Sequence, residues 1–562
     1  MIEILICSLF TNTIIYACGY TFSNHTLLTK NKTNFNHLFY IYFFGTIVLS
    51  FIALFINFFF SLNDNVNLIL YFLIFVSFLI KSKINFNKKE IKFLIISSAI
   101  TFLLLLYNNV NRPDAGLYHL PYISILNDYK IIFGITNIHH RFGHVSIMQY
   151  LSAINKNFLF SAESITIPLA SIISFFYIFF FNNILRVFKK KDHINSEKFF
   201  SLFILIYITY KIANYSNFGN DAVGNISFFY LISIILNSNL KKVDLNKILI
   251  TSIFIFLNKT ILGIVLIIPA VIFYIQYKLS LKKLFHITIS FPCLFFYFWL
   301  LKNVIVSGCF IFPLKISCLE KLEWTNSQQI IESQIEGEAW SKAWPDRLNK
   351  SISQSDYIKN LNWVKTWSNT HLIKILEILF PYLFFLFLTT IFLIKKNMIK
   401  YKKNNLYSNN GNNSFNVAFL ISTIGVISFF QFPLYRFSFS YIVSLISLFF
   451  IFFLKKKNFS YYNINIFKIF FILCFVIILS KQLYRILKIN SFEHPWPKIY
   501  NFSSEDSLVK EKKFISNNFF YYFSDKGDTL CMYGYSPCSN YLILKNIEYK
   551  KIYSYSFLIL LK

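Results

Sequence analysis

Long apolar runs recur along the whole chain and alternate with short polar connections. Most runs approach twenty residues, enough for a helix to cross the roughly 30 Å hydrocarbon core of a bilayer. The pattern predicts an all-α, polytopic membrane protein with about fourteen transmembrane segments. The segments are expected near residues 2–20, 38–60, 66–81, 91–107, 164–184, 198–212, 223–237, 247–257, 260–276, 285–303, 371–394, 415–430, 437–454 and 464–480.

Lysine-rich connections set the expected orientation. If the segments alternate, stretches such as 81–92, 189–193 and 395–403 all fall on one side, which the positive-inside rule assigns to the cytoplasm. The alternation needs two crossings within 247–276, where the pieces are short. We therefore expect a tight or partly re-entrant helix pair broken around Asn258–Lys259.

This topology divides the chain into membrane-embedded parts and non-cytoplasmic segments. The last segment contains strand-like runs at 528–536 and 540–549, which favour a small mixed α/β domain. The expected parts are N-terminal transmembrane helices (1–107), a non-cytoplasmic loop (108–163), central transmembrane helices (164–303), a non-cytoplasmic Trp-rich amphipathic loop (304–370), C-terminal transmembrane helices (371–480) and a non-cytoplasmic tail (481–562).

Composition narrows the class further. The chain is 56% hydrophobic and 14% charged, which excludes an ordinary soluble domain. Its net charge of +30 does not indicate nucleic-acid binding, because the lysines fall between apolar segments. Four of the eight cysteines lie in polar stretches that can form up to two disulfides, with the pairing open: Cys309, Cys318, Cys531 and Cys538.

Ionisable residues gather in the stretch 111–146, although they are scarce in most of the chain. Asp114 follows a predicted membrane helix directly after Pro113, and 115–126 is typical of a short helix lying on the membrane surface. Asp114 would then lie at the height of a lipid headgroup. The alternative is a capping aspartate among solvated interfacial histidines. The stretch also contains His119, His139, His140, Arg141 and His144.

No cofactor is certain from the sequence. His140 and His144 are four residues apart and could share a helical face, with Asp114 or His119 nearby. This spacing is the only indication of a bound divalent metal, and spacing alone is weak evidence.

Three further charged residues lie next to predicted helices. Asp221 begins an apolar run, so it is either a helix N-cap or a second carboxylate of the same site. Lys259 lies between apolar helices and either binds a phosphate or extends to the interface. Arg436 lies in an external turn after Pro433 and either holds an anionic headgroup or anchors a helix end.

The loop 304–370 contains five of the seven tryptophans. Trp is enriched at membrane interfaces, so amphipathic helices lying on the outer membrane surface are expected here, with most of the tryptophans as anchors. The tryptophans are Trp324, Trp340, Trp344, Trp363 and Trp367, and the loop also contains Glu332, Glu336 and Glu338.

The layout resembles the GT-C class of membrane glycosyltransferases. The similarity lies in the early non-cytoplasmic loop with its aspartate, the later Trp-rich loop and the tail. The blocks RPDAGLYHLP and HHRFG, SGCFIFP (307–313) and PLYRF (433–437) also resemble a group of poorly characterised bacterial multi-pass proteins of that architecture. The chain departs from the class in two respects: three extra helices precede the loop, and Ala115 replaces the second member of an acidic pair.

The resemblance implies transfer of a sugar from a polyprenyl-phosphate donor to an acceptor outside the cytoplasm, in a bacterial inner membrane with the site on the periplasmic face. The acceptor would be a cell-envelope glycan, lipid or protein. Asp114 would be the general base. Arg141, Arg436 and Lys259 would bind the lipid phosphate, and Asp221 and His119 would orient the acceptor.

Other functions fit the same sequence. A polysaccharide polymerase or ligase would rely on the loop 304–370 rather than on Asp114. A transporter or flippase of lipid-linked glycans would place ionisable residues midway through several helices, and apart from Lys259 the predicted helices contain few. A structural membrane component is the remaining alternative.

Overall fold

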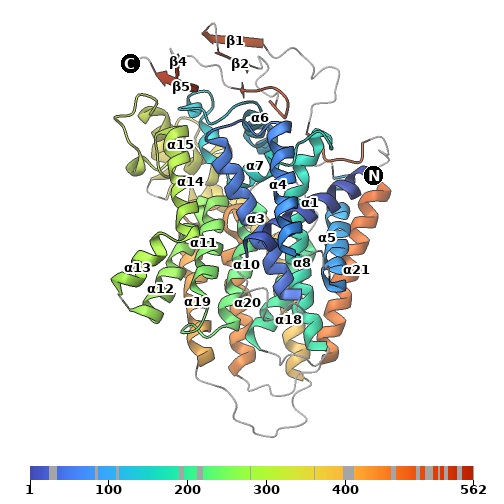
Figure 1. The fold of residues 1–562 in the computed structure, drawn as a ribbon. Helices are drawn as coiled ribbons and strands as arrows, with labels where there is room; N and C mark the ends of the chain where they lie inside the picture. The colour runs from blue at the N-terminus through green and yellow to red at the C-terminus, as the bar shows by residue number, and fades with distance from the viewer. Residues whose placement is uncertain are drawn as a thin grey trace.

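The computed structural model shows a mostly helical protein with a small C-terminal sheet region (Figure 1). The strands gather at one end of the helical body together with α6 (Leu120–Asp128) and α7 (Ile147–Ala153) (Figure 1). The structure describes the chain except residues 24–34, 83–86, 109–112, 189–194, 212–218, 220, 279, 360, 396–409, 457–463, 489–493, 500–510, 517–518, 524–529, 541–546 and 561–562. The expected basic stretches 189–193 and 395–403 therefore lie almost entirely outside the described residues.

Each predicted apolar segment coincides with helical structure. The helices of these segments are α1 (Ile2–Phe22), α3 (Phe35–Asn57), α4 (Asp64–Ser82), α5 (Lys88–Leu105), α8 (Ile167–Phe188), α9 (Ser196–Lys211), α10 (Asp221–Asn237), α11 (Leu245–Asn258), α12 (Ile267–Tyr277), α13 (Leu281–Thr288), α14 (Phe291–Ser307), α18 (Ile373–Lys395), α19 (Asn410–Phe429), α20 (Tyr435–Lys456) and α21 (Ile464–Lys488).

The structure does not confirm the expected count of fourteen spans. In the described part of the chain, eight helices are long and apolar enough to cross a membrane, or nine if the bent pair of α13 and α14 is one span. The difference has a physical reason. Helices α10 and α11 are only 17 and 14 residues long, and α5 carries Lys88, Lys89, Glu90 and Lys92 in its first turns.

The break expected around Asn258–Lys259 is present in the structure. Helix α11 ends at Asn258, and Lys259 has an extended backbone with φ −148° and ψ 101°. A 3-10 helix, η6 (Thr260–Leu266), then leads into α12. Because the regular helix stops at Lys259, its side chain is presented by an irregular segment between two helices.

Helices α1 and α3 cross at two glycines. A Cβ atom on Gly19 would lie 2.0 Å from the Ile41 carbonyl oxygen, and one on Gly45 would lie 2.0 Å from the Ile15 carbonyl oxygen. No side chain fits at either position without separating the backbones, and small residues serve this purpose in many membrane helix pairs.

Substitution of Gly45 by alanine should therefore lower stability, by about 1–3 kcal/mol, because overpacking forces the two helices apart. Thermal unfolding of the purified protein in detergent measures this effect as a lower melting temperature. Gly337→Ala is the matched control, since a Cβ there meets no atom within 4 Å and its melting temperature should not fall. Equal melting temperatures for wild type and Gly45→Ala would contradict the described crossing.

Asparagine side chains join the helix ends near the strands. Asn67 donates to the carbonyl oxygens of Leu62 and Ala153 at 2.8 and 3.0 Å. Asn127 donates to the same two carbonyl oxygens at 2.6 and 3.0 Å. These bonds fix α6 and α7 against the start of α4. The segment with Asp114, which precedes α6, is therefore attached to a fixed part of the protein.

The segment 115–126 is largely buried inside the protein, and its expected place at the membrane surface stays a prediction. It forms a π-helical turn, η1 (Ala115–His119), followed by α6, whose residues 120–127 are all buried. The buried face is covered by α7 and by the tail, since the Met532 N–H donates to the Gly116 carbonyl oxygen at 2.9 Å.

Two of the five tryptophans in 304–370, Trp363 and Trp367, are buried inside the protein and do not anchor the loop at the interface. Trp324 and Trp344 are half-buried, and Trp340 is 51% exposed. The indole of Trp324 donates to the Val304 carbonyl oxygen at 2.9 Å. The segment folds into α15 (Ser327–Ser341), α16 (Gln354–Ile358), α17 (Val364–Trp367) and the short turns η7 (Lys315–Ser317), η8 (Trp344–Asp346) and η9 (Ser368–Leu372).

The tail contains strands, which agree with the predicted runs in part. No strand lies in the described part of the run 528–536, whereas 547–549, at the end of the run 540–549, belong to a strand; residues 541–546 lie outside the described residues. The strands β1 (Glu511–Ser516) and β2 (Phe519–Phe523) are antiparallel, and β2 pairs in parallel with β3 (Cys538–Ser539). A separate antiparallel pair consists of β4 (Ile547–Ile552) and β5 (Tyr555–Leu560).

Candidate functional site

Asp114 lies between two arginines. Its Oδ2 atom is 2.5 Å from Nη1 of Arg436, and its Oδ1 atom is 3.3 Å from Nη1 of Arg141. Arg436 comes from the start of α20, whereas Arg141 belongs to the 3-10 turn η3 (His140–His144). The carboxylate is 19% exposed, so it is enclosed by cations yet reachable from outside.

A second ion pair lies beside the first. Lys259 donates to the Oδ1 atom of Asp221, and these side chains are 17% and 23% exposed. Arg436 is close enough to Asp221 for their charges to interact, so it connects the two pairs. The Lys259 amine also lies 4.1 Å from the ring centre of Phe437.

Glu336 of α15 adds a third carboxylate. It lies 3.7 Å from Nη2 of Arg141 and 3.8 Å from Nε2 of His140. Arg141 is thus shared between Asp114 and Glu336 at distances that leave both contacts loose. We call the six charged residues Asp114, Arg141, Asp221, Lys259, Glu336 and Arg436 the charged cluster.

The neighbouring cations lower the pKa of Asp114. Burial raises the pKa of this carboxyl, but the charges of Arg436 and Arg141 outweigh burial and hold it below its ordinary value. Asp114 is therefore ionised at neutral pH.

His119 is fixed behind Asp114. It is 4% exposed, and its Nδ1 atom is 2.8 Å from the Nε2 atom of Gln149. Gln149 also closes the capping box of α7 with Ser146. Burial lowers the pKa of His119 to about 4 and that of His140 to about 4, so both rings are neutral at pH 7.

These two histidines predict that stability falls as pH is lowered. Their ordinary pKa is about 6.5, so between pH 6.5 and 4 the unfolded chain binds protons that the folded chain does not. At pH 5 this costs roughly 2 kcal/mol per histidine. Melting temperatures between pH 7.5 and 5 should decline, and the decline should be shallower for His119→Asn. A flat profile for wild type would contradict the burial of these rings.

His140 and His144 do not form the helical face expected for a metal. They lie in the 3-10 turn η3, where residues four apart point in different directions. His139 contacts Asn540 at 2.9 Å, and the exposed His144 lies against the ring of Phe312. Within the described residues, no group of three or more His, Cys, Asp or Glu side chains is arranged to hold a metal ion.

Asn225 positions Arg436. Helix α20 has a kink at Ser438, and the Asn225 side chain accepts a bond from the Ser440 N–H at 3.1 Å. The same side chain donates to the Arg436 carbonyl oxygen at 3.4 Å. The sequence motif around Asp221 contains Asn225, but its role depends on a contact 211 positions away and could not be read from spacing.

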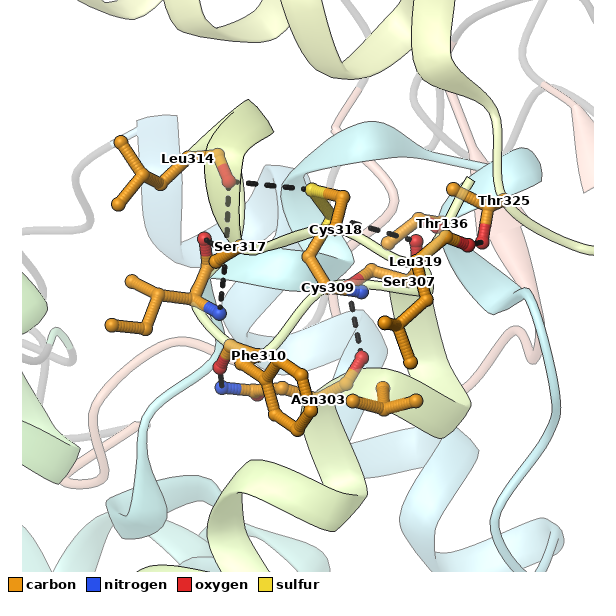
Figure 2. The surroundings of a disulfide bond; sticks show 12 residues. Thr136, Asn303, Ser307, Cys309, Phe310, Leu314, Ser317, Cys318, Leu319 and Thr325 are labelled. Carbon is orange, nitrogen blue, oxygen red and sulfur yellow. Dashed lines mark hydrogen bonds between the residues drawn. A yellow bond between two sulfur atoms is a disulfide. The ribbon is translucent and has the colours of Figure 1, made fainter. Parts of the chain in front are cut away.

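Two disulfides close loops next to the charged cluster. Cys309–Cys318 closes a short loop after α14 (Figure 2). The Phe312 ring of this loop lies against Gly143, within the turn that contains Arg141. Cys531–Cys538 closes the tail loop that covers η1. Both pairs come from the four cysteines that the sequence places in polar stretches.

Removal of the tail disulfide should loosen η1. The loop of 8 residues gives an entropic stabilisation of about 2–3 kcal/mol, and a double variant with Cys531 and Cys538 replaced by serine should lose that amount. The melting temperature should fall, and peptides of η1 should exchange amide hydrogens faster. Cys474→Ser, which removes a free thiol, is the control. Unchanged exchange in η1 would show that the tail loop does not hold it.

The fold and the cluster define a mostly helical protein with several helices long and apolar enough to cross a membrane and a cluster of six charged residues. The chain belongs to the family described as a domain of unknown function (DUF8201), whose family model matches residues 1–443. The match includes the whole charged cluster. No curated protein and no solved structure matches the chain.

Proposed function

We propose that this protein is a membrane glycosyltransferase that moves a sugar from a polyprenyl-phosphate donor to an acceptor outside the cytoplasm. The observation that carries the proposal is an ionised carboxylate, Asp114, held between Arg141 and Arg436 and next to the Lys259–Asp221 pair. A carboxylate can take a proton from an attacking hydroxyl, and paired guanidinium groups suit a phosphate leaving group.

The proposed reaction assigns each group one task. The acceptor hydroxyl oxygen attacks the anomeric carbon while Asp114 takes the hydroxyl proton. The bond between that carbon and the phosphate oxygen breaks, and the polyprenyl phosphate leaves with the electron pair. Arg436, Arg141 and Lys259 stabilise the charge that develops on the phosphate. Asp221 and His119 orient the acceptor.

Charge balance explains how a donor would activate this site. Three cations and three carboxylates make the charged cluster formally neutral, with the histidines uncharged. A bound phosphate would draw Arg436 and Arg141 away from Asp114 and add negative charge nearby. Both changes raise the pKa of Asp114 and make it a stronger base than in the free protein.

The proposed setting follows from the helix pattern and the charges. We infer a multi-pass protein of about fourteen crossings, with a GT-C-like layout, in the inner membrane of a bacterium. The charged cluster and the strands would face the periplasm, since the basic connections favour the opposite side as cytoplasmic.

Glu336 also favours a second candidate, a polysaccharide polymerase or ligase. Such an enzyme would rely on the segment 304–370, and Glu336 brings α15 of that segment to Arg141. The two candidate enzymes use different donors. The glycosyltransferase takes a sugar on a polyprenyl monophosphate, whereas a polymerase takes a long glycan on a polyprenyl diphosphate.

Binding of the lipid carrier tests the proposal. Native mass spectrometry of the purified protein should detect a bound polyprenyl phosphate at concentrations where the polyprenol of the same chain length does not bind. Equal binding of phosphate and alcohol would exclude a phosphate site, and preference for the diphosphate over the monophosphate would favour the polymerase.

A further inference from the structure

Helix α13 is amphipathic and mostly exposed, with Ile287 as its contact with the hydrophobic core. Its eight residues, Leu281–Thr288, include none that is buried. At 100° per residue, Leu281, Leu284 and Phe285 fall on one face, with Lys282, Lys283 and His286 on the other. Figure 1 shows α13 projecting from the helical body beside α12.

The apolar face is large for an exposed helix of this length. The exposed fractions of Leu281 and Phe285 are 79% and 65%, and that of Ile289, just after the helix, is 55%. On the flank, Tyr274 and Tyr277 of α12 are also exposed, and Tyr277 lies 5.7 Å from the Lys283 amine. Aromatic rings with polar tips are typical of the membrane interface.

The length of the intervening chain allows α13 to lie one membrane thickness from the charged cluster. The apolar span Thr260–Tyr277 begins next to Lys259, which belongs to the cluster, and is 18 residues long. At 1.5 to 2.0 Å per residue it can cover roughly 27–36 Å, which is enough for α13 to begin where the span leaves the hydrocarbon core. The chain then bends by 58° between α13 and α14 and returns.

The charge of this region has one sign. Between Asp244 and Glu320 the sequence contains no acidic residue, while Lys278, Lys282 and Lys283 are all exposed around α13. An amphipathic helix with lysines on its polar face and Leu and Phe on the other lies in the plane of the interface and attracts anionic lipids.

We propose that α13 is an interfacial docking helix for anionic phospholipids of the bilayer, on the side of the membrane opposite the charged cluster. Its apolar face enters the boundary between headgroups and acyl chains, and Lys282 and Lys283 hold the lipid phosphates. This inference does not depend on the proposed enzymatic function.

The test is lipid binding by native mass spectrometry, with the purified full chain titrated with phosphatidylglycerol or phosphatidylcholine. Wild type should bind phosphatidylglycerol preferentially, and the double variant K282Q/K283Q should bind it about 30-fold more weakly. The matched control is K241Q/K242Q, which removes two exposed lysines from the connection between α10 and α11.

Three outcomes would overturn the proposal. Unchanged phosphatidylglycerol binding by K282Q/K283Q would exclude α13 as the site. Equal losses in K282Q/K283Q and K241Q/K242Q would indicate general charge attraction. A dimer in the wild-type spectrum that Phe285→Ser converts to a monomer would show that a second copy of the chain covers the apolar face. Since all substituted residues are exposed, their melting temperatures should match wild type.

Discussion

Asp114→Asn lowers the rate of sugar transfer by about 10²–10⁴-fold, which is the usual contribution of a general base. Asparagine keeps the size of the side chain but cannot take the acceptor proton. Donor binding should change little, because Arg436, Arg141 and Lys259 remain in place. The measurement is kcat for transfer at saturating donor, with the melting temperature recorded in parallel.

The control for this variant is Asp356→Asn. Asp356 is 62% exposed and its ion pair is with Lys359, so the same chemical change away from the charged cluster should leave kcat unaltered. If Asp114→Asn retains full activity with an unchanged fold, Asp114 is not the base, although the class of reaction could still stand.

Arg436→Gln should lower kcat/KM for the lipid-phosphate donor by about 10²–10³-fold. The substitution removes a guanidinium from the leaving phosphate. It also leaves Asp114 with Arg141 alone, at 3.3 Å, so part of the loss should appear as lower stability. Arg436→Lys keeps the charge but not the planar fork and should show an intermediate loss.

A double variant separates these two effects. Asp114→Asn combined with Arg436→Gln removes both partners of the ion pair, so the melting temperature should recover toward wild type while activity stays absent. Arg347→Gln is the control, because Arg347 is not part of the charged cluster. Its guanidinium carbon lies 3.7 Å from the ring centre of Trp344. Full activity of Arg436→Gln would contradict its proposed contact with the phosphate.

The sequence predicted the charged cluster through the scarcity of ionisable residues. In a chain with 14% charged residues, Asp114, Asp221, Lys259 and Arg436 all lie at the ends of apolar segments. Such residues are costly in or near a membrane and tend to find one another. The structure does bring these four together with Arg141, and it places His119 close behind Asp114.

The ion pairs within the charged cluster could not be predicted from the sequence, because they join residues that are distant along the chain. Asp114 and Arg436 are 322 positions apart, and the tail loop that covers η1 comes from more than 400 residues further along the chain. The sequence does not distinguish Glu336 from Glu332 and Glu338. Its place in the charged cluster follows only from the contact between α15 and Arg141.

Local signals failed where packing overrode them. The segment 115–126 has the composition of an interfacial helix, yet α7 and the tail cover it, and Trp363 and Trp367 of 304–370 pack inside the protein. His140 and His144 have helical metal-ligand spacing, but their segment is a 3-10 turn. The break at Lys259 was readable because Asn and Lys interrupt an apolar run.

Sugar transfer by the purified protein tests the central claim most directly. The protein would be offered a panel of polyprenyl-phosphate sugars with envelope glycan, lipid and protein acceptors, and both products would be analysed. Wild type should yield a glycosylated acceptor and free polyprenyl phosphate in equal amounts, and Asp114→Asn should yield neither product. If wild type that binds the lipid carrier releases no sugar from any donor in the panel, the charged cluster does not perform glycosyl transfer.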